Sequence, residues 1–171
     1  MTEKRHPNVV NVDELEARTQ TQGTKFGFTS KALASAVGGK GLGCSHYELP
    51  PGRAAFPFHW HSALEEALFV LEGAGTLRIG DKKIPVKAGD YVAFPTGPET
   101  AHQMINTGSA PLKYLCFSTS ATVEVVGYPD SKKIAVSAAA SAADARAGKS
   151  WARQIFKEQP SAGYYEGEDV G

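Results

Sequence analysis

The sequence predicts an all-β protein built as a double-sheet jelly-roll barrel, with an N-terminal arm and an extended C-terminal tail. From residue 42 to about residue 120, short runs rich in β-branched and aromatic residues alternate with glycine and proline, which is typical of all-β sandwiches and barrels. The same region lacks the 3.6-residue periodicity of an amphipathic helix. Short strands at this spacing favour a jelly roll whose mouth can hold a small ligand.

The length of 171 residues is that of one ordinary domain with flanking segments. Such a chain is expected to bury about 70% of the surface that its unfolded form exposes, enough for one core. We predict an N-terminal arm over residues 1–39, the barrel over 40–127 and a C-terminal tail over 128–171.

The arm is mostly polar, and it is expected either to pack on the barrel or a second subunit, or to be disordered. Asn11 or Asp13 can cap a short helical turn, and a weak strand is predicted around Phe26–Thr29. The glycine-rich run 38–43 lacks the Gly-Lys-Ser/Thr ending of a phosphate-binding P-loop and opens no helix. We interpret it as a flexible turn.

The barrel is predicted to contain eight strands. They are Cys44–Leu49, Ala55–His61, Ala67–Leu71, Gly75–Ile79, Lys83–Val86, Asp90–Phe94, Gln103–Asn106 and Leu112–Ser118. Gly80 and Asp81 predict a tight hairpin, after which Pro85 requires an edge strand or a position without a ladder hydrogen bond. Alternation along the second strand would place Phe56 and Phe58 on the face opposite His59.

The tail begins with an alanine- and serine-rich stretch, 137–147, which predicts a low-complexity linker with some helical tendency. Its aromatic residues lie mainly in 151–156 and at Tyr164 and Tyr165. Because aromatic side chains in a polar tail usually dock, we expect contact with the outside of the barrel, with a partner subunit or with the cavity mouth.

Composition excludes several classes of protein. The formal net charge is zero, which argues against a nucleic-acid-binding protein. No apolar run approaches the about 20 residues that cross a bilayer, and the first residues lack the apolar core of a secretory signal. Cys44 and Cys116 are expected to be free, buried and reduced. We therefore expect a cytoplasmic protein that contacts neither nucleic acid nor membrane.

Four side chains form a candidate metal site. His59 and His61 are two residues apart in an extended segment, so they share one face and can reach one ion at about 2.1 Å. Glu66 opens an apolar run, where a carboxylate is costly unless it is paired or metal-bound. His102 opens a later strand. A metal-free polar cluster is the alternative interpretation.

The segment from Gly52 to Gly73 resembles the first motif of the cupin superfamily, in which a glycine precedes His-x-His, a glutamate and a second glycine. His59, His61 and Glu66 occupy the conserved positions, and the spacer after Gly52 is slightly longer than usual.

The second motif of the family is matched by Gly89, Pro95, Gly97, His102 and Asn106, with a longer gap before the histidine. The two motifs together cover roughly residues 40–120. The chain is similar to small single-domain bacterial cupins of the conserved-barrel type, including those resembling sugar-phosphate isomerases.

The resemblance implies a double-stranded β-helix with one divalent transition metal, Fe, Mn, Ni, Co or Zn, held by His59, His61, Glu66 and His102. Donor type alone does not select among these metals. Glu65 is an alternative ligand to Glu66, although the spacing to Gly73 favours Glu66. An octahedral ion would keep two positions open for a bidentate oxygen ligand.

Three functions are consistent with such a site. The first is metal-assisted isomerisation of the sugar-phosphate kind, for which Arg53, Arg78 or Lys113 could bind a phosphate. It also needs a general base, and no catalytic residue is assigned. The others are a non-haem iron dioxygenase and a non-enzymatic barrel that binds a small ligand.

We also expect a homodimer formed through one sheet. The runs Ala67–Leu71 and Leu112–Phe117 are apolar on both faces, which is typical of strands that are buried on both sides.

Overall fold

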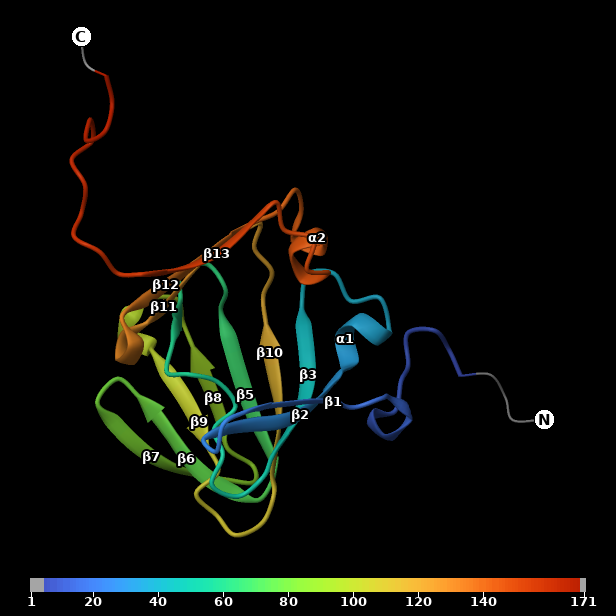
Figure 1. Cartoon of the computed structure of the whole chain (residues 1–171). Helices are drawn as coiled ribbons and strands as arrows, with labels where there is room; N and C mark the ends of the chain where they lie inside the picture. The colour runs from blue at the N-terminus through green and yellow to red at the C-terminus, as the bar shows by residue number, and fades with distance from the viewer. Residues whose placement is uncertain (1–4, 170–171) are drawn as a thin grey trace.

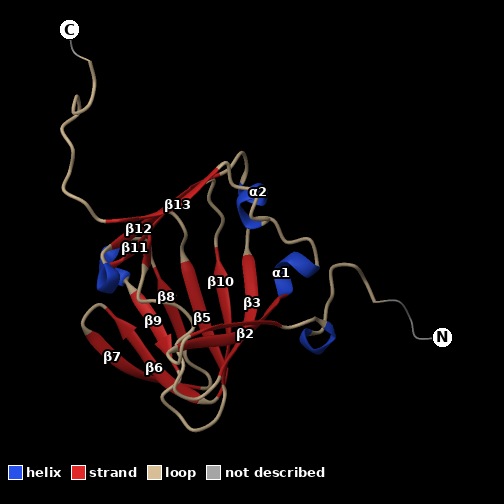
Figure 2. Cartoon of the chain, in the orientation of Figure 1, coloured by secondary structure: helices blue, strands red, loops and turns tan. Residues whose placement is uncertain are grey.

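The computed structural model describes residues 5–169, and antiparallel strands form its body (Figures 1 and 2). The larger sheet has the strand order β1-β2-β3-β10-β5-β8. These strands are β1 (Arg18–Gln22), β2 (Phe26–Ala32), β3 (Gly43–Leu49), β10 (Leu112–Ser118), β5 (Glu66–Glu72) and β8 (Tyr91–Phe94). The all-β jelly-roll prediction is confirmed.

Two smaller sheets complete the barrel. The first, in the order β7-β6-β9, contains β7 (Lys82–Lys87), β6 (Ala74–Ile79) and β9 (His102–Ile105). The second, which we call the C-terminal sheet, contains β13 (Ala152–Lys157), β12 (Lys133–Ala138), β11 (Val123–Tyr128) and the short β4 (Trp60–His61). Figure 1 shows β11, β12 and β13 across one end of the barrel.

Within the described part of the chain, helical structure is limited to segments of three to five residues. The α-helices are α1 (Leu33–Ala36) and α2 (Ala142–Arg146), and the 3₁₀ turns are η1 (Val12–Glu14), η2 (Pro98–Thr100) and η3 (Pro129–Ser131). Within residues 5–169, no helix is long and apolar enough to span a bilayer.

The apolar core lies between the two barrel sheets. Leu49, Val70 and Leu112 from the larger sheet and Leu77 from β6 are at most 1% exposed. Burying each such side chain contributes on the order of 1.5–3 kcal/mol. The core therefore fixes the barrel walls on which the candidate site stands.

The predicted hairpin at Gly80 and Asp81 and the predicted edge position of Pro85 are both observed. Gly80 and Asp81 join β6 to β7, and Pro85 lies on β7, an edge strand. Gly73 adopts a φ of +83°, and a Cβ there would lie 2.5 Å from the Pro111 carbonyl oxygen. Only glycine fits this turn.

The predicted strand Ala55–His61 is wrong over most of its length. Regular pairing is limited to Trp60–His61, with isolated bridges at Ala54 and His59. Proline at position 57 cannot donate to a ladder, so alternation is lost before His59. Phe56 consequently lies in the same cavity as His59 instead of on the opposite face.

Both flanking segments contain strands. β1 and β2 extend the larger sheet beyond β3, while β12 and β13 extend β11. The expected helical cap at Asn11 is confirmed by its side chain, which accepts a hydrogen bond from the Asp13 amide.

The alanine- and serine-rich stretch contains the end of β12 and the helix α2, and is therefore ordered by pairing and capping. Past β13 the described chain extends away from the barrel (Figure 1), and Tyr164 and Tyr165 are 91% and 68% exposed. Their expected docking on this chain's own barrel is not observed.

Cys44 and Cys116 are free, as predicted, but both are partly exposed and not fully buried as expected. Cys44 pairs across β3 and β10 with Phe117, and Cys116 pairs with Ser45. Neighbouring residues alternate between faces, so the two thiols lie on opposite sides of the sheet and cannot bridge.

Candidate metal centre

His59 and His102 are brought together by backbone pairing. The His102 amide donates to the His59 carbonyl at 2.7 Å, and the His59 amide donates to the His102 carbonyl at 3.1 Å. The two ring centroids are 4.7 Å apart. Residues far apart in the sequence therefore present their imidazoles to the same space.

Glu66 completes the cluster from the first position of β5. Its Oε2 atom lies 3.5 Å from the Nε2 atom of His61 and 3.3 Å from that of His102. One ligand atom each from His59, His61 and Glu66 lies within 4.8 Å of the others. His102 stands outside this group of three but contacts Glu66, so the four predicted side chains meet around Glu66, whereas Glu65 is exposed.

The orientation of two imidazoles is fixed by the backbone. The Nδ1 atom of His59 lies 2.8 Å from the Pro57 carbonyl oxygen, and that of His102 lies 3.0 Å from the Thr100 carbonyl oxygen. A carbonyl oxygen only accepts, so each Nδ1 carries a hydrogen, which leaves Nε2 as the ring atom that can bind a metal. This arrangement is usual for metal-binding histidines, and the donor set therefore fits a divalent ion.

Glu124 on β11 was not identified from the sequence. The side chain is buried, and its carboxylate accepts hydrogen bonds from the amides of Ser62 and Leu64 at 2.9 and 2.8 Å. Its Oε1 atom also lies 3.7 Å from the Nδ1 atom of His61, which is buried without a hydrogen-bond partner. In the sequence, the only sign of this residue is that it is a glutamate flanked by valines in the run Val123–Val126.

The titratable groups are strongly coupled. Burial, with the neighbouring charges of His102 and His61, lowers the pKa of His59 to about 4. Burial also opposes the charging of His61, but the neighbouring carboxylates of Glu124 and Glu66 outweigh it and raise its pKa to about 9. His102 and His61 in turn hold the pKa of Glu66 well below its usual range despite burial. Without metal, His61 and Glu66 form a partly buried ion pair.

The cluster opens into a cavity of about 320 Å³, which we call the metal cavity. It is lined by the four candidate ligands together with mainly aromatic, apolar and neutral side chains: Tyr47, Ala55, Phe56, Pro57, Leu68, Gln103, Met104, Tyr114, Cys116, Val126, Tyr128 and, as the one added cation, Arg153. Burial raises the pKa values of Tyr114, Cys116 and Tyr128. Glu66 is the only carboxylate among these described lining residues.

The three cations proposed from the sequence as phosphate ligands have structural partners elsewhere. Arg53 donates to the carbonyls of Gly23 and Phe26. Arg78 pairs with Asp130 at 2.6 Å, and Lys113 pairs with Glu72 at 2.8 Å. None of the three lines the metal cavity.

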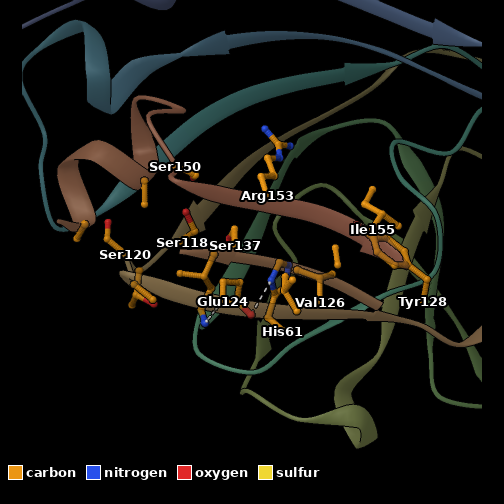
Figure 3. A pocket seen from close by; sticks show the side chains of 17 residues that line it. His61, Ser118, Ser120, Glu124, Val126, Tyr128, Ser137, Ser150, Arg153 and Ile155 are labelled. Carbon is orange, nitrogen blue, oxygen red and sulfur yellow. Dashed lines mark hydrogen bonds and ion pairs between the residues drawn. The ribbon is translucent and has the colours of Figure 1, made fainter. Parts of the chain in front are cut away.

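A second cavity of about 340 Å³ adjoins the first, and we call it the outer cavity (Figure 3). The two cavities share His61, Val126, Tyr128 and Arg153. The outer cavity lies against β11, at the end of the predicted barrel, and against β12 and β13, which lie in the segment predicted as a tail.

Comparisons with known proteins agree with this geometry. Residues 45–118 match the cupin domain family. The chain is 42% identical to an uncharacterized protein of Methanocaldococcus jannaschii over 60 residues, 35% of this chain and 46% of that protein. It is 37% identical to an oxalate-binding protein of Thermotoga maritima over 68 residues, 40% of this chain and 54% of that protein. The chain spans about half the length of these relatives.

Two crystal structures are similar over more of the chain. A protein of Acidithiobacillus ferrooxidans, described as a candidate sugar phosphate isomerase, has a TM-score of 0.71 and 27% identity, covering 76% of this chain and 86% of that chain. A sugar phosphate isomerase of Silicibacter pomeroyi has a TM-score of 0.74 and 23% identity, covering 95% of this chain and 96% of that chain. The second similarity bears on the fold alone.

Proposed function

We propose that this chain, which belongs to the cupin superfamily, binds one divalent transition metal through His59, His61, Glu66 and His102 and acts on a small oxygenated metabolite. The observation that supports this proposal is the convergence of the four side chains, with the Nδ1–H groups of two histidines held by backbone carbonyls. Imidazole and carboxylate ligands suit Fe, Mn, Ni, Co or Zn.

The reaction we propose is isomerisation of a hydroxy-carbonyl compound of the sugar-phosphate kind. When bound, the ion would supply a Lewis acid for a carbonyl and its neighbouring hydroxyl. The likeness to the Acidithiobacillus ferrooxidans protein supports this substrate class. Tyr128 lines the metal cavity close to His59, with ring centroids 6.2 Å apart. Because burial raises its pKa, we assign it the role of holding a proton for a substrate oxygen.

A second candidate function is binding of a small chelating ligand without turnover. It is favoured by the absence of a free base among the described residues of the metal cavity, where Glu66 is the only carboxylate. Burial raises the pKa values of Tyr47, Tyr114, Cys116 and Tyr128, so these side chains stay protonated at neutral pH. The similarity to an oxalate-binding protein agrees with a bidentate oxygen ligand.

The metal site is tested by elemental analysis of protein purified without added metal. We expect about one divalent ion per chain in the wild type and a large loss in His59→Ala and His102→Ala. His46→Ala is the matched control because His46 lies on β3 outside the metal cavity. Equal metal content in all four proteins would overturn the site assignment.

The reaction is tested with metal-loaded protein and aldose or ketose phosphates in deuterium oxide. Isomerisation predicts deuterium incorporation next to the carbonyl, detectable by NMR. Binding without exchange would favour the second candidate. Oxygen consumption by iron-loaded protein in the presence of a chelating substrate would instead favour the dioxygenase alternative.

We also propose a homodimer formed through the outer face of the larger sheet. Phe69, Leu71 and Tyr91 on this part of the sheet are 37%, 43% and 64% exposed in the single chain, and Phe69 pairs directly with Tyr91. An exposed apolar sheet face of this kind is suited to a second copy. Light scattering that shows only monomer would contradict it.

A further inference from the structure

We propose that the outer cavity is a subsite for an oxyanion and that Arg153 binds a phosphate or carboxylate group there. The substrate would then carry two functional ends, with chelating oxygens at the metal and an anionic group at Arg153. This inference rests on the proposed metal function and specifies the class of substrate.

The metal cavity and the outer cavity adjoin and share four lining residues. His61, Val126, Tyr128 and Arg153 line both. With volumes of about 320 and 340 Å³, each has room for a few non-hydrogen atoms of a ligand. A ligand held at the four metal-site residues can therefore extend past Tyr128 to Arg153.

Arg153 has the properties that an anion-binding residue needs. Among the described residues, no acidic side chain forms an ion pair with its guanidinium, unlike that of Arg78, which pairs with Asp130. A guanidinium offers five donors in a planar fork that matches phosphate and carboxylate oxygens. The unpaired cation lines a cavity instead of a flat surface.

The surroundings of Arg153 add further donors. Ser137 lies directly opposite Arg153 in the register of β12 and β13, and Ser118 also lines the outer cavity. Figure 3 shows Arg153 on one side of this cavity and His61 with Glu124 on the other. The Glu124 carboxylate accepts bonds from backbone amides of residues 62–64, so both of its oxygens already have donors.

The test compares three probes that share a 2-hydroxycarboxylate head. Glycerate has no distal anion, 3-phosphoglycerate has a distal phosphate and malate has a distal carboxylate. Calorimetric titration of zinc-loaded wild-type protein is expected to give about tenfold tighter binding for 3-phosphoglycerate than for glycerate, in line with a charge-assisted hydrogen bond. The result for malate tells whether a carboxylate shares this gain or only phosphate has it.

Arg153→Gln should remove the gain, so that 3-phosphoglycerate binds it no more tightly than glycerate does, while Arg153→Lys should keep part of the difference. Lys82→Gln on the exposed β7 is the control for loss of one positive charge. The inference is overturned if glycerate and 3-phosphoglycerate bind wild type equally, or if the difference persists in Arg153→Gln. Failure of the metal function gives a different result: no probe binds, or glycerate binds His59→Ala as tightly as wild type.

Discussion

The metal cavity has two walls that differ in how they are stabilised. The barrel wall, from β5, β9 and β10, places buried apolar residues beside the candidate ligands. The C-terminal sheet contributes His61, Val126, Tyr128 and Arg153 to the cavity, with Glu124 beside His61, while every residue of β13 is exposed. The barrel wall therefore holds Glu66 and His102 beside the apolar core, whereas the C-terminal sheet supplies His61 and covers the site.

Glu66→Gln should have the largest effect, because it removes the carboxylate from the rigid wall. We expect metal affinity to fall by more than about 100-fold, since a ligand and its negative charge are lost together. Glu65→Gln, on the exposed neighbouring residue, is the matched control. Competition titration with a chromophoric chelator measures both, and equal losses would contradict the assignment of Glu66.

Gly127→Ala tests the pairing of β11 with β4 within the C-terminal sheet. A Cβ at Gly127 would clash with the Trp60 indole, and Trp60 stands between His59 and His61 in the sequence. We expect a loss of about 1–3 kcal/mol in the free energy of unfolding from this overpacking, measured by urea denaturation. Gly41→Ala has open space around its Cβ, and a similar loss there would show that the indole contact is not the cause.

Glu124→Gln tests whether the second wall tunes the metal site. Loss of its charge beside the Nδ1 atom of His61 should lower metal affinity by about 10–100-fold and change the visible spectrum of the cobalt-loaded protein. Glu48→Gln on β3 is the control. An unchanged spectrum and affinity in Glu124→Gln would restrict Glu124 to its bonds with residues 62–64.

The pH dependence of metal affinity reports the contribution of both walls to His61. Its pKa of about 9 means that the metal-free protein holds a proton on this ring at neutral pH, and metal binding must release it. Apparent affinity should therefore rise about tenfold per pH unit up to about pH 9. His59, with a pKa of about 4, is already neutral. Calorimetry in two buffers counts the released proton. A metal affinity that stays constant from pH 7 to 9 would contradict the release of a proton from His61.

Removing the chain after Pro160 should have the smallest effect. Residues 161–169 are exposed, so the free energy of unfolding is expected to change by less than about 0.5 kcal/mol. A larger change in the thermal midpoint, dependent on protein concentration, would indicate that Tyr164 and Tyr165 dock on a second subunit.

Much of the barrel could be predicted because its signals are local. Strand alternation, the Gly80–Asp81 turn and the spacing of His59, His61, Glu66 and His102 are all visible in the sequence. Where alternation was assumed across Pro57, the prediction was wrong, because one proline ends the ladder and moves Phe56 into the metal cavity.

The strand class of the barrel and the four side chains that meet around Glu66 could be predicted from the residue pattern alone. The tertiary structure decided that Glu124 faces His61, that Arg153 lines both cavities, and that Arg53, Arg78 and Lys113 have other partners. The physical reason is that alternation fixes which residues of a strand share a face, but not which strand that face meets. Pairing of β11 with β4, across about 60 residues of sequence, depends on the folded barrel.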